Sequence, residues 1–219
     1  MTRHSVRNPE AFAVWEITGA SAGYGFQQEW YPTLWQRTSG CGPTAVSEIL
    51  FYLERNRLRN GNSGLMKSEA LALMQGVWTS VTPTIHGIPN TEILRRGIAA
   101  YSAANGMPYD TEAVEIPAKP SLRPDLRTLL ALIGSALDQD LPVAFLNLNN
   151  GTVKNLDSWH WVVIVSLEYS EDLSSAVITF PDEGLKKQID FAEWFRTTSR
   201  GGGLVKISKH TAFSSVTGD

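Results

Sequence analysis

Cys41 is the only cysteine in the 219-residue chain, and it stands between two glycines at the start of an amphipathic segment. Pro43 follows two residues later, and proline is favoured in the first turn of a helix. The apolar residues beyond it recur at spacings of three and four, at Ala45, Val46, Ile49, Leu50 and Leu53. Because this period places them on one face, the sequence predicts a buried helix that begins at Cys41 or one residue after it.

A cysteine at a helix N-terminus is a candidate nucleophile. The unpaired N–H groups and partial positive charge of the helix end favour a thiolate over a thiol. Gly40 and Gly42 allow a tight turn and leave the sulfur accessible. A lone cysteine beside an apolar helix is, however, more often a small buried hydrophobic residue. The nucleophile interpretation therefore needs a matching base elsewhere in the chain.

The hydrophobic period changes from helical to extended along the chain. Further helices are predicted with a cap at Ser68 and an end at Gly76, with a cap at Asn90 or Thr91 and an end at Gly106, and from Asp125 onwards. Strands are predicted at residues 141–148, 159–167, 175–180 and 203–208, with a short helix capped by Asp190 before the last strand. Helices followed by strands predict an α+β fold.

Composition suits one domain over residues 1–219, because 42 % of the residues are hydrophobic and 19 % are charged. We expect a mainly helical lobe at about 30–140, an antiparallel sheet lobe at about 141–208 and a flexible tail at 209–219. The formal net charge of −3, without a block of basic residues, argues against nucleic acid as a partner. One cysteine and scattered histidines give no disulfide framework and no metal-ligand spacing, so no cofactor is expected.

The N-terminal segment shows no targeting signal. Residues 1–10 lack the apolar core of a signal peptide, and no apolar run approaches the about 20 residues of a membrane span. If Met1 is the native start, the sequence predicts a cytoplasmic protein without a membrane partner. The sequence gives no oligomeric state.

Four histidines are candidates for the base. His4 and His210 lie near the chain termini, which are expected to be mobile. His86 lies in a predicted loop at 78–89 and is the second choice. His160 opens the most apolar predicted strand, so its ring would be held rigidly, as a general base within hydrogen-bonding distance of a nucleophile requires. The alternative for His160 is a structural histidine.

Asp182 and Gln36 complete the candidate site. The predicted strand at 175–180 is followed by Pro181-Asp182-Glu183-Gly184, and if it is an antiparallel neighbour of the His160 strand, the start of one lies beside the end of the other. The carboxylate would then orient the ring and stabilise the imidazolium. The alternative is that this segment only forms a turn. Gln36, five residues before the cysteine, would donate to a developing oxyanion together with the Cys41 backbone N–H.

These segments, taken together, resemble the papain-like cysteine peptidases. The resemblance covers about residues 30–208 and rests on Gln36 before Ser-Gly-Cys41-Gly-Pro-Thr-Ala, on Trp-His160-Trp-Val-Val-Ile-Val and on Phe-Pro-Asp182. The sequence is most similar to the branch of the bacteriocin leader peptidases, or double-glycine peptidases, and their stand-alone bacterial relatives. The resemblance implies a helical lobe packed against an antiparallel sheet. It also implies that Cys41 is the nucleophile, His160 the base, Asp182 the orienting acid and Gln36 the oxyanion residue.

Two positions depart from the family pattern. Gln36 stands five residues before the cysteine where six are expected, and Glu183 follows the acid in place of a proline. The implied activity is acyl transfer through a Cys41 thioester, on a peptide or amide substrate. Water as acceptor makes the enzyme a peptidase or amidase, and an amine makes it an acyltransferase or transglutaminase-like enzyme. A catalytically inactive binding module with the same fold is the remaining interpretation.

Overall fold

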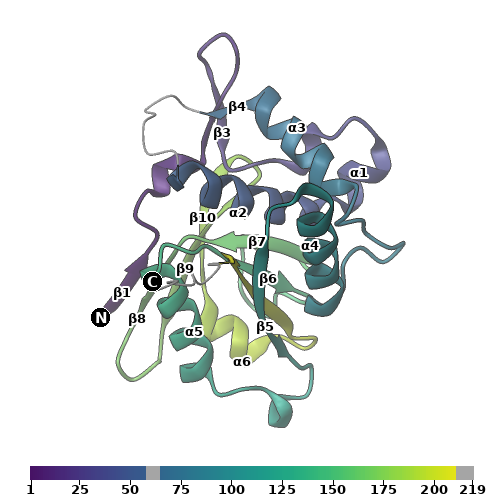
Figure 1. The fold of residues 1–219 in the computed structure, drawn as a ribbon. Coiled ribbons are helices and arrows are strands. Elements are labelled where there is room, and N and C mark those ends of the chain that lie inside the picture. Colours follow the sequence, from purple (N-terminus) through teal and green to yellow (C-terminus); the bar gives the residue numbers. More distant parts are fainter. Residues whose placement is uncertain (58–64, 211–219) are drawn as a thin grey trace, which may run out of the picture.

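The computed structural model describes residues 1–57 and 65–210, and in this part of the chain the protein is a mixed α+β structure with six α-helices and three sheets (Figure 1). The helices are α1 Leu34–Ser39, α2 Cys41–Arg57, α3 Lys67–Trp78, α4 Thr91–Asn105, α5 Leu126–Asp138 and α6 Phe191–Thr197. The strands are β1 Thr2–Ser5, β2 Ala13–Trp15, β3 Ser21–Tyr24, β4 Leu65–Met66, β5 Tyr109–Ile116, β6 Val143–Asn147, β7 His160–Ile164, β8 Ser166–Tyr169, β9 Ala176–Asp182, β10 Leu185–Asp190 and β11 Gly202–Lys209. The α+β class predicted from the sequence is confirmed.

Two four-stranded antiparallel sheets carry most of the strands. One has the order β5-β11-β6-β7 and the other the order β1-β8-β9-β10, while a small sheet of order β3-β2-β4 lies at the top of Figure 1. Only Val165 separates β7 from β8, so the chain passes from one large sheet to the other at this residue. Its N–H donates to the Thr179 carbonyl of β9 at 2.9 Å. This step places β7 beside β9.

Helix α2 begins at Cys41, as the sequence predicted, and packs against β7 and β6. Its buried residues include Ala45, Val46, Ile49 and Leu50. Each fully buried Val, Leu or Ile contributes about 1.5–3 kcal/mol to folding by leaving water. Gly40 joins α1 to α2 at a close approach, since a Cβ there would lie 2.4 Å from the Gln36 carbonyl oxygen. A glycine before Cys41 therefore permits the turn that sets the sulfur at the helix N-terminus.

The predicted caps of α4 and α6 are present. The Asn90 side chain accepts a hydrogen bond from the Ile93 N–H at 2.9 Å, and Gly106 ends α4 with a φ of 62°. Asp190 accepts from the backbone N–H groups of the first turn of α6. These caps satisfy N–H groups that a helix start leaves unpaired.

The predicted cap of α3 is wrong. Ser68 lies inside the helix, which begins at Lys67 and continues past Gly76 to Trp78. The Glu69 carboxylate accepts from the Met66 N–H at 3.1 Å, so an acidic residue in the first turn fixes the start of the helix instead. A single glycine in a helix interior costs only about 1 kcal/mol, and packing overrides that cost at Gly76.

Three strands that the sequence patterns did not predict alter the division into lobes. β5 pairs with β11, so a strand from the predicted helical lobe belongs to a large sheet. β1, at the N-terminus that was expected to be mobile, pairs with β8. β10 pairs with β9 across Glu183 and Gly184, whose φ values of 51° and 75° suit a tight hairpin turn. Residues 211–219 of the predicted tail lie outside the described residues.

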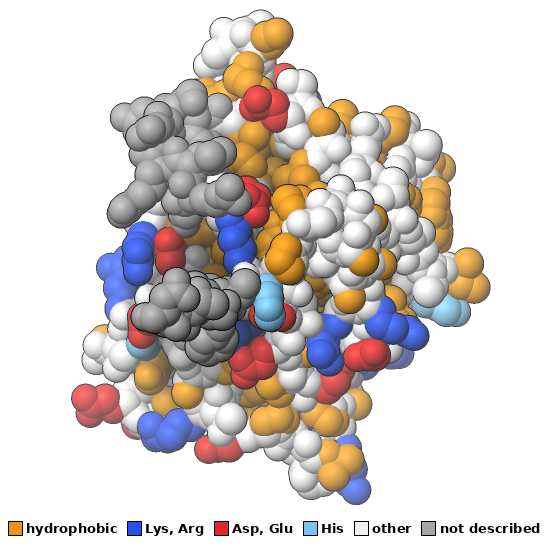
Figure 2. Space-filling model, in the orientation of Figure 1, with side chains coloured by type: hydrophobic (Ala, Val, Ile, Leu, Met, Phe, Trp, Pro, Cys, Tyr) orange, Lys and Arg blue, Asp and Glu red, His pale blue; other side chains and the backbone are white. Residues whose placement is uncertain are grey.

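The surface carries mixed charge on the face that Figure 2 shows, where acidic and basic side chains lie interspersed. Within residues 1–57 and 65–210, no helix combines the length and apolar character needed to cross a bilayer.

Candidate active site

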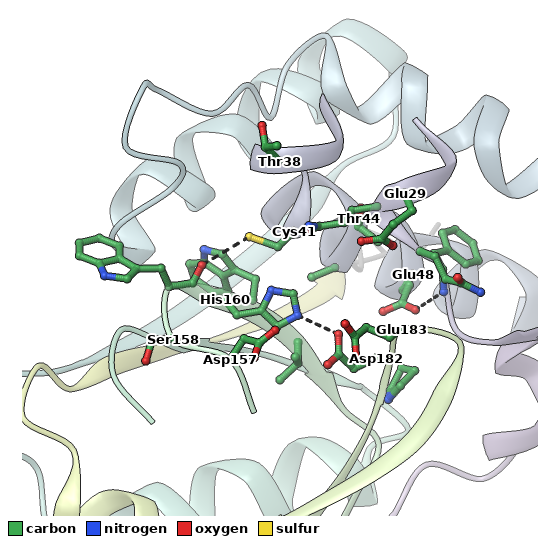
Figure 3. Close-up of a pocket in the computed structure, with 18 residues that line it drawn as sticks. Glu29, Thr38, Cys41, Thr44, Glu48, Asp157, Ser158, His160, Asp182 and Glu183 are labelled. Carbon is green, nitrogen blue, oxygen red and sulfur yellow. Dashed lines mark hydrogen bonds and ion pairs between the residues drawn. The ribbon is translucent and has the colours of Figure 1, made fainter. Parts of the chain in front are cut away.

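Helix α2 and strands β7 and β9 together line a cavity of about 310 Å³ (Figure 3). Cys41 lies at the N-terminus of α2, His160 is the first residue of β7 and Asp182 is the last residue of β9. The structure thus brings together three of the four predicted site residues, which lie far apart in the sequence. Figure 3 shows the Cys41 sulfur on one side of the His160 ring and Asp182 on the other.

His160 and Asp182 form a partly buried hydrogen-bonded pair. The His160 Nε2 and Asp182 Oδ1 atoms lie 2.8 Å apart, and the two side chains are 17 % and 8 % exposed. The sequence analysis expected the strand that precedes Asp182 to pair with the strand that His160 opens. In the structure β9 pairs instead with β8, the strand that continues β7. Since Nε2 faces the carboxylate, Nδ1 is the ring nitrogen left for Cys41.

Lys187 on β10 holds the second oxygen of Asp182. Its Nζ lies 2.8 Å from Asp182 Oδ2 and 2.5 Å from Glu183 Oε2. Burial raises the pKa of Asp182, but the hydrogen bond and charge of His160, and then those of Lys187, lower it below the ordinary value overall. A carboxylate placed between two cations stays ionised and keeps a fixed orientation. Sequence analysis missed Lys187 because β10 was not predicted.

His160 is cationic at neutral pH. Burial lowers its pKa, but the hydrogen bond to Asp182 and the interaction with the Cys41 side chain raise it, with a net value of about 10. An imidazolium next to a cysteine at a helix N-terminus stabilises the thiolate. The arrangement therefore suits a thiolate–imidazolium pair.

Trp159 holds the chain in an unusual conformation next to this pair. Its φ of 60° lies in the left-handed region, which is uncommon for residues other than glycine and is often found at functional sites. The Cys41 Sγ lies 4.0 Å from the Trp159 carbonyl oxygen, the outer limit for a hydrogen bond that involves sulfur. The left-handed turn directs this carbonyl toward Cys41 just where β7 begins.

Gln36 does not reach the cavity, contrary to the prediction. Its Oε1 accepts from the Thr33 hydroxyl at 2.9 Å, and the Thr33 Oγ1 accepts from the Gln36 N–H at 3.2 Å. The two residues form a capping box at the start of α1, and Gln36 is not among the residues that line either cavity at Cys41. The Cys41 backbone N–H remains a candidate oxyanion donor, since the first N–H groups of a helix lack intrahelical acceptors.

The other histidines lie elsewhere. His4 Nδ1 pairs with Asp138 Oδ1 at 2.8 Å, and His210 Nδ1 pairs with Asp110 Oδ2 at 2.9 Å. His86, the second choice for the base, lines a neighbouring cavity that also reaches Cys41. Of the four histidines, His160 alone lines the cavity of Figure 3.

Glu48 is a buried carboxyl group in the same cavity that sequence analysis did not identify. It lies seven residues after Cys41, two turns along the same face of α2, and is 3 % exposed. Its Oε1 accepts from the Phe26 N–H at 2.5 Å. Burial raises the pKa of Glu48 well above the ordinary value, although the Phe26 hydrogen bond lowers it and nearby Asp182 raises it further. The sequence feature that could have identified Glu48 is the presence of a glutamate within the predicted apolar helix.

Glu48→Gln is expected to gain stability relative to the native chain as pH rises above about 4.5. The folded protein keeps Glu48 protonated while the unfolded chain ionises it, so the native chain loses up to about 1.4 kcal/mol per pH unit through this proton. Glutamine accepts the same Phe26 hydrogen bond but has no proton to lose. Urea unfolding of both proteins between pH 4.5 and 7.5 measures the difference, and a constant difference across this range would contradict a buried neutral Glu48.

Five of the residues that line this cavity, which is called the acidic cavity below, carry carboxyl groups. They are Glu29, Glu48, Asp157, Asp182 and Glu183. Among the described residues that line it, His160 is the only basic one. A cavity of this composition suits an amine or another cationic group.

Among the described residues, no group of three or more His, Cys, Asp or Glu side chains is placed to hold a metal ion. Neither protein-family models nor curated protein sequences give a match to this chain.

Proposed function

We propose that this protein is a cysteine-dependent peptidase or amidase that acts through a Cys41 thioester on a papain-like fold. The observation that carries the proposal is the position of the His160 ring, which Asp182 holds at Nε2 and which faces Cys41 at the start of α2. Packing of the nucleophile helix against an antiparallel sheet, and the sequence resemblance around Cys41, His160 and Asp182, support it further.

The reaction follows from the ionic pair. The Cys41 thiolate attacks the amide carbonyl carbon, a C–S bond forms, and the Cys41 N–H stabilises the oxyanion, such a donor being worth about 10²–10³ in rate. The C–N bond then breaks, and the His160 imidazolium gives its proton to the leaving amine. Neutral His160 next takes a proton from water as the water attacks the thioester. The thiolate leaves, and the imidazolium and the carboxylic acid product result.

Acyl transfer to an amine is a second candidate, which the acidic cavity favours. The proton donor His160 lines this cavity, so the leaving amine and the incoming acceptor lie on this side of Cys41. Glu48 is buried and protonated and Lys187 pairs with Asp182 and Glu183, so Glu29 and Asp157 are the carboxylates that would attract a cationic acceptor and disfavour an anionic one. A neutral amino group of the acceptor attacks the thioester and gives its proton to neutral His160, so that an amide forms, the thiolate leaves and the imidazolium is restored.

Reaction with an activated acyl ester tests both candidates. We expect the Cys41 peptide to gain the mass of one acyl group, with release of one equivalent of alcohol in a burst. When a diamine is present, acyl amide is expected at the expense of free acid, and glycine at the same concentration is expected to give much less amide. An adduct at Cys41 with no amide would favour hydrolysis alone.

Absence of any adduct at Cys41 would contradict the enzyme proposal and favour an inactive binding module. Cys41→Ala serves as the control, because any acylation that persists in this variant lies on other side chains.

A further inference from the structure

Cys41 also lines a second cavity, of about 260 Å³, which differs from the acidic cavity in composition. Its apolar side chains are Ile85, Ile88 and Leu146, which line this cavity alone, and Trp159 and Trp161, which also line the acidic cavity. The remaining lining residues are Thr38, Ser39, His86 and Gly87, and no carboxylate is among them. This apolar cavity and the acidic cavity thus meet at the sulfur.

The outer wall of the apolar cavity is a tight loop fixed by hydrogen bonds. Thr84 and Gly87 exchange backbone hydrogen bonds of 2.9 Å, and the His86 N–H donates to Thr84 Oγ1 at 3.2 Å. The Trp161 indole N–H donates to the Ile88 carbonyl at 2.8 Å, which ties the loop to β7. The wall is therefore built before any ligand binds.

Ile85, at the tip of this loop, is exposed to solvent. Its side chain is 84 % exposed although it lines the cavity, and the Trp159 side chain on the opposite β7 side is half-exposed. Covering such side chains with an apolar group removes apolar surface from water and is favourable. Exposed apolar residues beside a nucleophile are typical of a ligand-binding groove.

Proton transfer decides which part of the substrate lies in which cavity. The leaving amine must receive its proton from His160, and His160 lines the acidic cavity but not the apolar one. The amine therefore lies on the acidic side of Cys41. The acyl part, on the other side of the attacked carbonyl carbon, lies against the apolar wall.

We infer that the residue that donates the acyl group carries an apolar side chain, of about the size of leucine or phenylalanine, which binds between Ile85 and Trp159. This inference rests on the proposed function and adds the class of the acyl donor. It makes Ile85 a specificity-determining residue, remote from the proton transfers.

The inference is tested by the rates at which two peptidyl chloromethyl ketones alkylate Cys41. The two reagents differ only in the residue next to the reactive carbon, which is glycine in one and leucine in the other. Iodoacetamide is the small reference reagent. We expect the leucine reagent to react at least about tenfold faster than the glycine reagent, the usual scale for an apolar side chain in a pocket. Ile85→Asp should reduce this ratio to near one, with each ketone rate divided by the iodoacetamide rate of the same variant.

Ile17→Asp is the matched control, since Ile17 is 90 % exposed and lines neither cavity. Equal rates for the two ketones, or a ratio that Ile85→Asp does not change, would overturn the inference while the proposed chemistry stands. Failure of all three reagents to label Cys41 would overturn the proposed function together with it.

Discussion

Cys41→Ser is expected to reduce turnover of an activated ester or amide by at least about 10³-fold, the scale seen when a member of a catalytic triad is removed. A serine hydroxyl stays protonated at neutral pH, and it needs a neutral base to become a nucleophile. The hydrogen bond to Asp182, which the variant keeps, still raises the pKa of His160, so the ring stays inclined to the imidazolium form and is a poor base for the serine. A thiol is a much stronger acid than a hydroxyl and a stronger nucleophile once ionised, so cysteine depends less than serine on a neutral base.

The fold of Cys41→Ser should be retained, because oxygen and sulfur are similar in size and the first turn of α2 is held by backbone contacts. The Thr44 N–H, for example, donates to the Gly40 carbonyl at 2.9 Å. Urea unfolding should therefore place its stability within about 1 kcal/mol of the native value. Unchanged turnover in a folded serine variant would remove Cys41 as the nucleophile.

The residues that sequence analysis placed correctly are those whose position depends on local pattern. Cys41 is fixed by the Gly-Cys-Gly-Pro segment and by the helical period that follows, and both are visible in one stretch of sequence. His160 is fixed by the start of an apolar strand. Asp182 required one further assumption, that neighbouring strands run antiparallel, which is the usual arrangement for strands joined by short connections.

The residues that sequence analysis missed or misplaced depend on competing local interactions or on register. Gln36 stands one residue closer to the cysteine than the family pattern expects, and its hydrogen bonds to Thr33, three residues earlier, make it part of a capping box. Lys187 reaches Asp182 only because a two-residue turn sets the register of β9 and β10. Strand β1 was missed since its polar sequence gains its order from β8, which lies more than 160 residues away in the chain.

His160→Ala is expected to have the second-largest effect, on the pH dependence of Cys41 alkylation by iodoacetamide. In the native protein the imidazolium is present up to about pH 10, so it stabilises the thiolate throughout the neutral range, and labelling should persist well below pH 7. Without the cation, labelling at pH 6 should fall at least about tenfold and shift to the alkaline range of an ordinary thiol. His86→Ala, which removes the other histidine near the sulfur, is expected to leave the profile in place.

Asp182→Asn should shift the pH dependence of Cys41 alkylation in the same direction as His160→Ala, but by a smaller amount. The carboxylate raises the pKa of His160, so its loss lets the ring deprotonate at lower pH, yet an amide oxygen still holds Nε2. The raised pKa of His160 also makes the stability of the fold depend on pH. Because the folded pKa of His160 lies above its ordinary value, its contribution is complete below about pH 6.5 and is lost as pH rises toward about 10. A loss of labelling in Asp182→Asn equal to that in His160→Ala would contradict the assignment of an orienting acid. Labelling that His160→Ala leaves unchanged would show that the sulfur and the ring do not act as a pair.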